Sequence, residues 1–381
     1  MDEERRRLLA LTEEKKNNRN ALGKSIGIAK KKGQPTTEID QLLIHMHQLD
    51  LEIEDLDSQV SILSDQIDQI LVSVPNLPHS SVPDINTFSL PHEARHWGTP
   101  REFPWEPKSH RDIGKDLKVI DWGNGTKPSE IVSPVYWGAG AKLKRAVVQY
   151  SLNQLETAGY LEAQPANIMD QTCISKCGCN PEEARHFVKL DTDQFLAPYA
   201  TLPLISIFQD TILKGSDLPV LHSTSLTCIQ MHSSRTLSQF LQLGLIGLTT
   251  PELSYPEMEK MVFVVETILQ NLGLPYRVLT PSATELKFSA AKTYIIKIWM
   301  PNQNSYVEVA SITNSEAFIA RRLGIRFRNA PKEKPQHVHT LDCILLIDQL
   351  IASLLENDQN DDGSVQLPTV LHAFAGTDRI C

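Results

Sequence analysis

The feature that most limits how this chain can fold is a long heptad repeat near its N-terminus. Apolar residues recur at alternating steps of four and three over residues 42–70. A seam held over four heptads is typical of a coiled coil rather than of a helix inside a compact core. Residues 8–29 keep the same spacing with a poorer core. The seam positions are Leu42, Met46, Leu49, Ile53, Leu56, Val60, Leu63, Ile67 and Ile70, preceded by Leu8, Leu11, Lys15, Asn18, Leu22, Ser25 and Ala29.

A break between these two segments predicts a hairpin. Gly33-Gln34-Pro35 interrupts the pattern, and Thr36 or Thr37 can cap a second helix. Residues 1–33 carry ten Lys or Arg against five Asp or Glu, so net +5, whereas residues 38–73 carry nine Asp or Glu and no Lys or Arg. Opposite charge favours pairing of the two helices. We therefore predict an antiparallel coiled-coil arm over residues 1–73.

The remainder predicts a connector and one large domain of the α+β class. Prolines mark a connector over residues 74–107, and residues 108–381 mix helical and strand patterns without regular alternation. Such a mixture suggests an antiparallel sheet flanked by helices. A helix that enters a strand is expected over 143–161, and further helices over 255–272 and 341–355. The expected strands are 276–279, 293–300 and 305–312.

Composition narrows the class of protein further. The sequence has no run of about 18 apolar residues, so it predicts no membrane helix. The charged start Met1-Asp2-Glu3 does not resemble a signal peptide. Cys173, Cys177 and Cys179 form a C-x3-C-x-C cluster that could be half of a metal site. No second Cys or His pair sits at finger spacing, so we favour free thiols in a loop and predict no metal site. A net charge of -9 argues against nucleic acid, but the basic charge is concentrated in the first segment, as a polyanion contact requires.

Several short sequence motifs, which follow one another in a fixed order, resemble motifs of the seryl-tRNA synthetase family. They include Val74-Pro75-Asn76-Leu77-Pro78-His79 at the end of the arm, Trp97-Gly98-Thr99-Pro100-Arg101, and His110-Arg111-Asp112-Ile113-Gly114. Residues 138–165 resemble motif 1 of that family, and Phe288-Ser289-Ala290-Ala291-Lys292 and Val338-His339-Thr340-Leu341 follow in its order. The resemblance covers nearly the whole chain.

This resemblance implies a class II synthetase-like fold, ATP with magnesium, serine and a tRNA acceptor. It implies that the arm binds tRNA, with tRNA-Ser as the expected one and Arg19, Lys24, Lys30, Lys31 and Lys32 as the expected contacts. The alternative for these cations is a solvated helix face. The expected protein partner is a second copy or another seryl-tRNA synthetase chain, and no membrane is expected. The ending at residues 376–380 resembles mitochondrial members, which predicts a mitochondrial location, or otherwise a cytoplasmic one.

The expected active site departs from the family at several positions. Gln230 stands where motif 2 carries an Arg for the α-phosphate, and His232 stands where it carries a Glu. Gly244 replaces a later carboxylate, and Thr201 replaces the Glu that clasps the serine amine. Gln349 replaces the motif 3 Arg, and residues 336–377 contain no Lys or Arg. A neutral Gln makes no charge-assisted contact with phosphate.

Part of the expected pocket is kept. Glu308 matches a metal-holding carboxylate of the family, and Ser311 and Asn314 match its neighbours. We favour the simpler interpretation of Glu308, that it is a strand residue kept for local hydrogen bonds and not a metal ligand.

We therefore predict a relative that is not an enzyme, uses neither ATP nor magnesium, and binds tRNA or pairs with a synthetase. It is similar to a degenerate mitochondrial relative found in insects. The alternatives are an active serine–tRNA ligase with a divergent site, which would need ATP and magnesium, and a purely structural coiled-coil partner.

Overall fold

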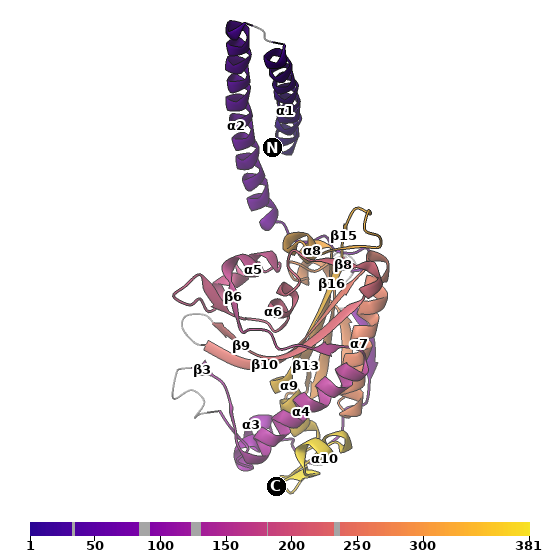
Figure 1. Cartoon of the computed structure of the whole chain (residues 1–381). Helices are drawn as coiled ribbons and strands as arrows, with labels where there is room; N and C mark the ends of the chain where they lie inside the picture. The colour runs from indigo at the N-terminus through magenta and orange to yellow at the C-terminus, as the bar shows by residue number, and fades with distance from the viewer. Residues whose placement is uncertain (33–34, 84–91, 123–130, 181, 232–236) are drawn as a thin grey trace. The chain divides into compact units, whose positions relative to one another are not determined.

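Two long antiparallel helices, α1 (Asp2–Lys31) and α2 (Thr36–Val72), form the N-terminal unit of the chain, Met1–Val74 (Figure 1). Charge complements the seam between them, since the Lys15 Nζ of α1 lies 2.7 Å from a carboxylate oxygen of Glu52 in α2. The predicted hairpin is confirmed. The structure is a computed structural model that describes residues 1–32, 35–83, 92–122, 131–180, 182–231 and 237–381.

The buried seam of α1 differs from the predicted one by single positions. Thr12 and Ile26 are buried, whereas Leu11 is only partly buried and Ser25 is exposed. The Thr12 hydroxyl donates a 2.8 Å hydrogen bond to the Leu8 carbonyl, so its polar atom is satisfied without water. A strict heptad count misplaces these residues because a helix turn of 3.6 residues drifts from a repeat of 3.5.

The second unit, Pro75–Cys381, is built on a nine-stranded sheet. Its path runs β1-β11-β12-β13-β16-β10-β9-β5, with β3 beside β10. The pairs along this path are antiparallel except that β5 and β3 run parallel to their neighbours. The strands are β1 (His92–Trp97), β3 (Ile131–Val132), β5 (Leu161–Glu162), β9 (Val220–Met231), β10 (Leu237–Thr249), β11 (Tyr276–Thr280), β12 (Lys292–Met300), β13 (Ser305–Glu316) and β16 (His339–Leu346).

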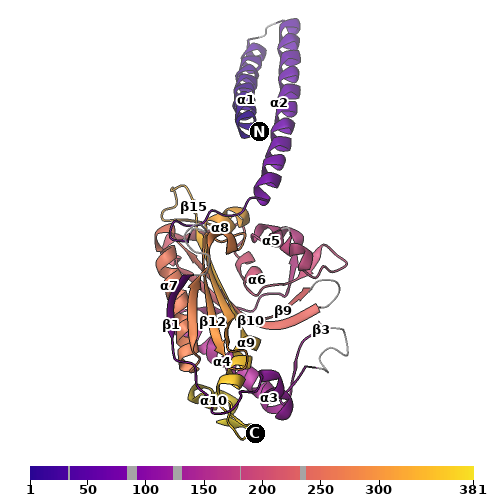
Figure 2. The same ribbon diagram turned by 180° about the vertical axis from the view of Figure 1, so that it is seen from behind.

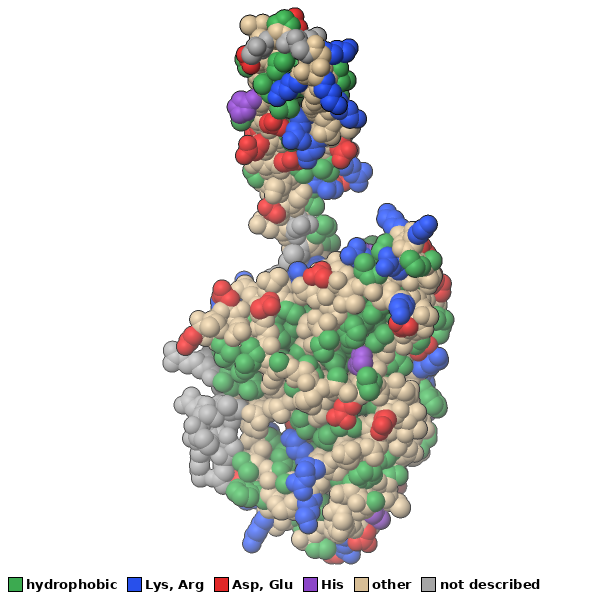
Figure 3. Space-filling view, viewed as in Figure 1, with side chains coloured by type: hydrophobic (Ala, Val, Ile, Leu, Met, Phe, Trp, Pro, Cys, Tyr) green, Lys and Arg blue, Asp and Glu red, His purple; other side chains and the backbone are tan. Residues whose placement is uncertain are grey.

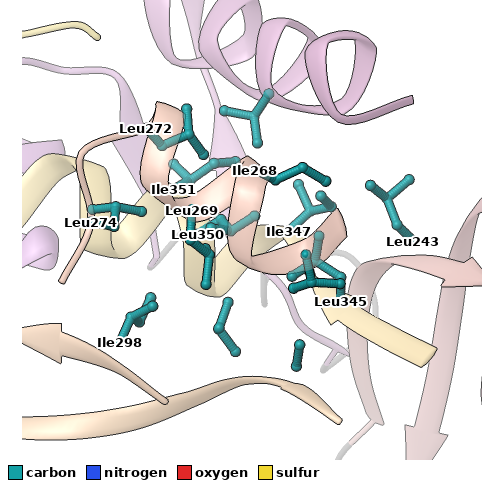
Figure 4. Packing of buried hydrophobic residues seen from close by; sticks show 14 of the residues in the cluster. Leu243, Ile268, Leu269, Leu272, Leu274, Ile298, Leu345, Ile347, Leu350 and Ile351 are labelled. Atoms are coloured by element: carbon teal, nitrogen blue, oxygen red, sulfur yellow. The ribbon is translucent and has the colours of Figure 1, made fainter. Parts of the chain in front are cut away.

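Helices cover both faces of this sheet. Apolar side chains of α4, α7, α9 and α10 fill one face, as Figure 4 shows for Ile268, Leu345 and Leu350. Side chains of α5, α6 and α8 fill the other face in a second buried cluster. The helices are α3 (His110–Asp116), α4 (Gly138–Thr157), α5 (Gln171–Lys176), α6 (Thr201–Ser206), α7 (Ser254–Asn271), α8 (Phe318–Leu323), α9 (Ile347–Asn357) and α10 (Thr369–Ala375).

Short strands form smaller sheets around this frame. β8, β14 and β15 make a three-stranded sheet, and three two-stranded sheets pair β2 with β4, β6 with β7 and β17 with β18. Their bounds are β2 (Ile120–Asp121), β4 (Val135–Tyr136), β6 (Ile168–Asp170), β7 (Gln194–Leu196), β8 (Ile212–Lys214), β14 (Arg326–Arg328), β15 (Gln336–His337), β17 (Val365–Gln366) and β18 (Arg379–Ile380). No helix in the described ranges is both long and apolar enough to cross a membrane.

The Pro-rich connector belongs to the second unit and is tied to it. The Asn76 backbone N–H donates to the Phe288 carbonyl at 2.9 Å, and the Asn76 side chain donates to the Ser289 and Ser315 carbonyls. Further along, β1 adds an edge strand to the sheet next to β11 (Figure 2).

One helix prediction is wrong in its first half. Residues 339–346 form the central strand β16, and the helix α9 starts only at Ile347. Leu341, Cys343 and Leu345 fill one face of the sheet while Ile344 and Asp342 face the other way, toward Ile246 and the second cluster. Because β16 is covered on both faces, its apolar run lacks the alternation that distinguishes a strand from a buried helix.

Candidate functional site

A small cavity lies on the sheet face that α5 and α6 cover. Its volume is about 60 Å³. Ile246 of β10 and Ile344 of β16 belong to its floor, and its polar lining comes from four separate parts of the chain. We call it the sheet pocket; its polar and charged lining residues are Glu183, Tyr199, Thr201, Lys287, Ser289 and Asp342.

The pocket wall at residues 198–201 lies unusually close to the sheet. A Cβ atom added to Gly244 would lie 2.8 Å from the Ala200 Cβ and 3.0 Å from the Thr201 nitrogen. The Ala200 N–H also donates to the Gln242 side-chain oxygen at 3.0 Å. Gly244 therefore allows α6 to start directly on β10, and the carboxylate that the family resemblance expects at this position has no room there.

Gln230 supports the same wall. Its side-chain Nε2 donates a 3.0 Å hydrogen bond to the Pro198 carbonyl. Thr201 is buried at the start of α6 and lines the pocket. The structure thus brings Gln230 and Thr201 into one region, where Gln230 holds the backbone of the wall. His232 lies outside the described residues.

Charged groups that the sequence analysis did not single out converge on the pocket. Asp342 reaches it from β16, Lys287 from the turn before β12, and Glu183 from the segment after α5. The Lys287 Nζ donates to the Ser311 hydroxyl at 3.1 Å. Burial raises the pKa of Asp342 to about 6, against the lowering effect of the Lys287 charge. At neutral pH the Asp342 carboxyl is therefore ionised and can accept hydrogen bonds.

The size and charge of the sheet pocket favour one kind of ligand. One water molecule needs roughly 10–15 Å³ of cavity volume. A cavity of about 60 Å³ therefore holds about four to six waters or a molecule of similar size. Two carboxyl groups and one ammonium suit a small zwitterion, which carries one charge of each sign. The Tyr199 and Thr201 hydroxyls add neutral hydrogen-bonding groups.

Of the residual pocket predicted from the sequence, Ser311 is the member tied to the sheet pocket, through Lys287. Asn314 is fully buried two residues before Glu316, and its Oδ1 accepts from the Glu316 backbone N–H at 2.8 Å. Glu308 is exposed and pairs across the strands with Lys297, outside the pocket lining. This placement suits the structural role that we considered for Glu308.

Gln349 lies in the first turn of α9, where its Nε2 contacts the Met300 sulfur at 3.6 Å. The neighbouring Asp348 joins three elements. Its carboxylate accepts from the Tyr136 hydroxyl at 2.7 Å and from Lys144 Nζ at 2.6 Å, and its other oxygen accepts from the Leu241 N–H at 2.8 Å. Lys144 of α4 thus places a positive charge beside the first turn of α9, which contains no Lys or Arg of its own.

The three clustered cysteines are buried free thiols. Cys173 lies in α5, whereas Cys177 and Cys179 lie in the loop that follows it and line the sheet pocket. Within the described ranges, no three His, Cys, Asp or Glu side chains gather as a metal site would require.

The predicted tRNA-binding cations of the arm divide into two groups. Arg19 forms a 2.8 Å ion pair with Asp50 of α2, which occupies its charge. Lys24, Lys30, Lys31 and Lys32 are exposed at the end of α1 and form no ion pair with any acid in the described ranges. Their role in tRNA binding stays a prediction.

Comparison with known proteins first defines the class. Residues 187–358 match the family model of the tRNA synthetase class II core domain (G, H, P, S and T), and residues 1–78 match the seryl-tRNA synthetase N-terminal domain. The chain belongs to the seryl-tRNA synthetase family.

Its relatives align over nearly their whole length. A serine–tRNA ligase of Carboxydothermus hydrogenoformans is 39% identical over 392 residues, covering 100% of this chain and 92% of the relative. The serine–tRNA ligase of Geobacillus kaustophilus is 38% identical, covering 99% and 91%. The structure of seryl-tRNA synthetase from Pyrococcus horikoshii complexed with ATP matches with a TM-score of 0.88 and 29% identity, covering 100% of this chain and 91% of that one.

These relatives contradict the main functional prediction from the sequence. We predicted that the chain is not an enzyme and uses neither ATP nor magnesium. Its full-length similarity to serine–tRNA ligases indicates an ATP-dependent enzyme instead. The special likeness to a degenerate mitochondrial relative is not supported either, since these ligases are bacterial. We compared each family position in the sequence alone and did not consider which other residues share the pocket. Thr201 removes one acid, but Asp342 and Glu183 supply carboxyl groups to the same pocket from elsewhere in the chain.

Proposed function

We propose that this protein is an ATP-dependent serine–tRNA ligase with a rearranged amino-acid pocket. The observation that carries the proposal is the joint placement of Lys287, Asp342 and Glu183 around a cavity of about 60 Å³. The full-length similarity to serine–tRNA ligases supports the reaction class.

In this proposal the pocket holds serine by its two charges. The serine ammonium donates to the Asp342 and Glu183 carboxylates, the serine carboxylate lies toward Lys287, and the hydroxyl meets Thr201 or Tyr199. A serine carboxylate oxygen then attacks the α-phosphorus of ATP and pyrophosphate leaves. In the second step a hydroxyl at the tRNA 3′ end attacks the serine carbonyl carbon and AMP leaves. Fixed charges stabilise the negative charge that both steps develop.

The described side chains do not fit a protein-held magnesium site. Glu308 lies opposite Lys297 in the register of β12 and β13, outside the lining of the sheet pocket, and no cluster of three suitable ligands exists in the described ranges. Magnesium commonly binds through substrate phosphates with one or two carboxylates. We therefore propose that magnesium would be held by the ATP phosphates rather than by a preformed site of the protein.

We also propose a homodimer rather than a mixed pair with another synthetase chain. Trp137 and Leu161, just before and after α4, are 53% and 66% exposed. Trp137 directly precedes the segment 138–165 that resembles motif 1 of the family, Leu161 lies within it, and we place the dimer contact there. Light scattering should give twice the chain mass, and Leu161→Asp should shift it toward the monomer. A mitochondrial location stays a prediction.

The test of the proposed function is serine-dependent exchange of pyrophosphate into ATP by the purified protein. Exchange above background with serine, and not with alanine, supports a ligase. Absence of exchange in a folded protein, at millimolar ATP, magnesium and serine, contradicts it.

A further inference from the structure

One face of the three-stranded sheet β8-β14-β15 concentrates positive charge. The parallel register places Lys214 beside Arg328. Arg326 stands two residues before Arg328, so both arginines share a face, whereas Phe327 between them is buried in the second core cluster. The outward face of β14 and its neighbours thus carries Lys214, Arg326 and Arg328; we call it the β14 face.

This arrangement is unfavourable for the isolated protein. Like charges on neighbouring strands destabilise a sheet, and none of these three cations forms an ion pair with an acid in the described ranges. On the same face, the Arg326 Nε and the Nδ1 of its cross-strand neighbour His337 are buried without a hydrogen-bond partner among the described residues. Buried polar atoms of this kind are uncommon and costly. Because these two atoms lie too deep for a partner to reach, it is the surface charge of Lys214, Arg326 and Arg328, without an ion pair in the described ranges, that points to a negatively charged partner.

The turn between β14 and β15 extends the same surface. Lys332 and Lys334 are exposed there, while Glu333 turns back, because its carboxylate accepts from the Asn329 N–H at 3.1 Å. Figure 3 shows Lys and Arg side chains gathering beside the position of β15 in Figure 1. The chain as a whole has a net charge of -9, so this concentration is local.

We propose that the β14 face and its turn bind the phosphate backbone of RNA, as a contact separate from the arm. Guanidinium groups pair with phosphate oxygens in a two-point geometry, and lysines add charge without sequence preference. Ile212 is the one large apolar side chain of these three strands that is exposed, so the surface offers little to lipid chains. The inference rests on the proposed function in one respect: it takes the RNA to be the tRNA substrate.

The test compares two double variants with the same change in net charge. Lys332→Glu with Lys334→Glu alters the β14–β15 turn, and Lys115→Glu with Lys118→Glu alters an exposed site at α3 in the same unit. Binding of a serine-accepting tRNA transcript is titrated at several salt concentrations, and circular dichroism confirms folding. Since each phosphate contact contributes roughly 0.7–0.9 to the slope of log affinity against log salt, the turn variant should lose about 1.5 from this slope. Its affinity at moderate salt should fall about tenfold, while the α3 variant changes less than about threefold.

The same samples separate this inference from the proposed function. Serine-dependent pyrophosphate exchange needs no tRNA, so both variants should keep it. Equal loss of RNA affinity in the two variants, or none in the turn variant, overturns the β14 face as an RNA contact. Binding of the wild type to anionic vesicles that the turn variant loses, with RNA affinity unchanged, would assign the face to lipid and also overturn it.

Discussion

The arm and the sheet pocket differ in how their residues find one another. In the arm, the pairing of the two helices follows from the regular repeat, and the ion pairs Lys15–Glu52 and Arg19–Asp50 join α1 to α2 across it. In the sheet pocket, Glu183, Lys287 and Asp342 come from distant parts of the chain and meet only in the folded unit. A sequence repeat can therefore be interpreted position by position, whereas the charge of a binding site is known only when all the residues that fold around it are considered together.

The largest effect should follow from removing the pocket charges. Lys287→Ala or Asp342→Asn should lower serine-dependent pyrophosphate exchange roughly 10²–10³-fold, since one charged contact in a site contributes about 3–4 kcal/mol. The matched control is Lys297→Ala, a lysine of β12 outside the pocket lining. If the control lost as much activity as Lys287→Ala, the pocket would not be where serine binds.

The close contact of α6 with β10 gives the next effect, on stability. Gly244→Ala forces a Cβ to 2.8 Å from the Ala200 Cβ, whereas a Cβ at Gly247 would meet its neighbours at 3.4 Å, an ordinary contact. Overpacking of this kind costs about 1–3 kcal/mol, so Gly244→Ala should lower the thermal midpoint clearly and Gly247→Ala should lower it little. Equal midpoints for the two variants would refute the close approach at Gly244.

The pocket should also show in the pH dependence of stability. Burial raises the pKa of Asp342 to about 6, above its usual 3.8, so the folded protein binds this proton more tightly than the unfolded chain. The contribution is complete below pH 4 and is lost as the pH rises through 6. Asp342→Asn should therefore flatten the stability profile between pH 4 and 6 and raise stability at pH 8.

Asp358 provides the control for that profile. Burial raises the pKa of Asp358 to about 7, yet this residue is outside the pocket lining. Asp358→Asn should flatten its own part of the profile while leaving pyrophosphate exchange intact. A steeper slope in Asp342→Asn, or loss of exchange in Asp358→Asn, would contradict these assignments.

The smallest effect should lie in the arm. Breaking the Lys15–Glu52 pair with Lys15→Met should cost at most about 1 kcal/mol, because both side chains are partly exposed and water screens the charges. Chemical unfolding in low and high salt measures it, and the difference between wild type and variant should shrink in high salt. A salt-independent loss above about 2 kcal/mol would mean that this pair is buried more than the structure shows.

Much of the fold could be predicted because its patterns are local. The arm, α7 and the strands β11 to β13 follow from periodicity and β-branched runs. The strand β16 could not, because burial on both faces gives it the same apolar run as a helix. The seam shift at Thr12 could not be predicted either, because a strict heptad count ignores the drift of a 3.6-residue turn, and the buried hydroxyl is satisfied within its own helix.

The site was harder to predict, for a different physical reason. Gln230 donates a hydrogen bond to the Pro198 carbonyl, and a residue larger than glycine at 244 would clash with Ala200. Neither role is visible in a position-by-position comparison. Lys287 and Asp342 carried one available signal: charged residues next to apolar, strand-forming runs, where a charge is costly unless it serves a site.

The two-sided burial of β16 has a consequence for folding fidelity. Asp342 and Ile344 face the pocket while Leu341, Cys343 and Leu345 face the packed helices. If β16 paired with β10 or β13 one residue out of register, the Asp342 carboxyl would enter the apolar layer and the leucines would fill the pocket. The Asp342 carboxyl thus disfavours the misaligned pairing, because burying it in the apolar layer would raise the free energy of that intermediate.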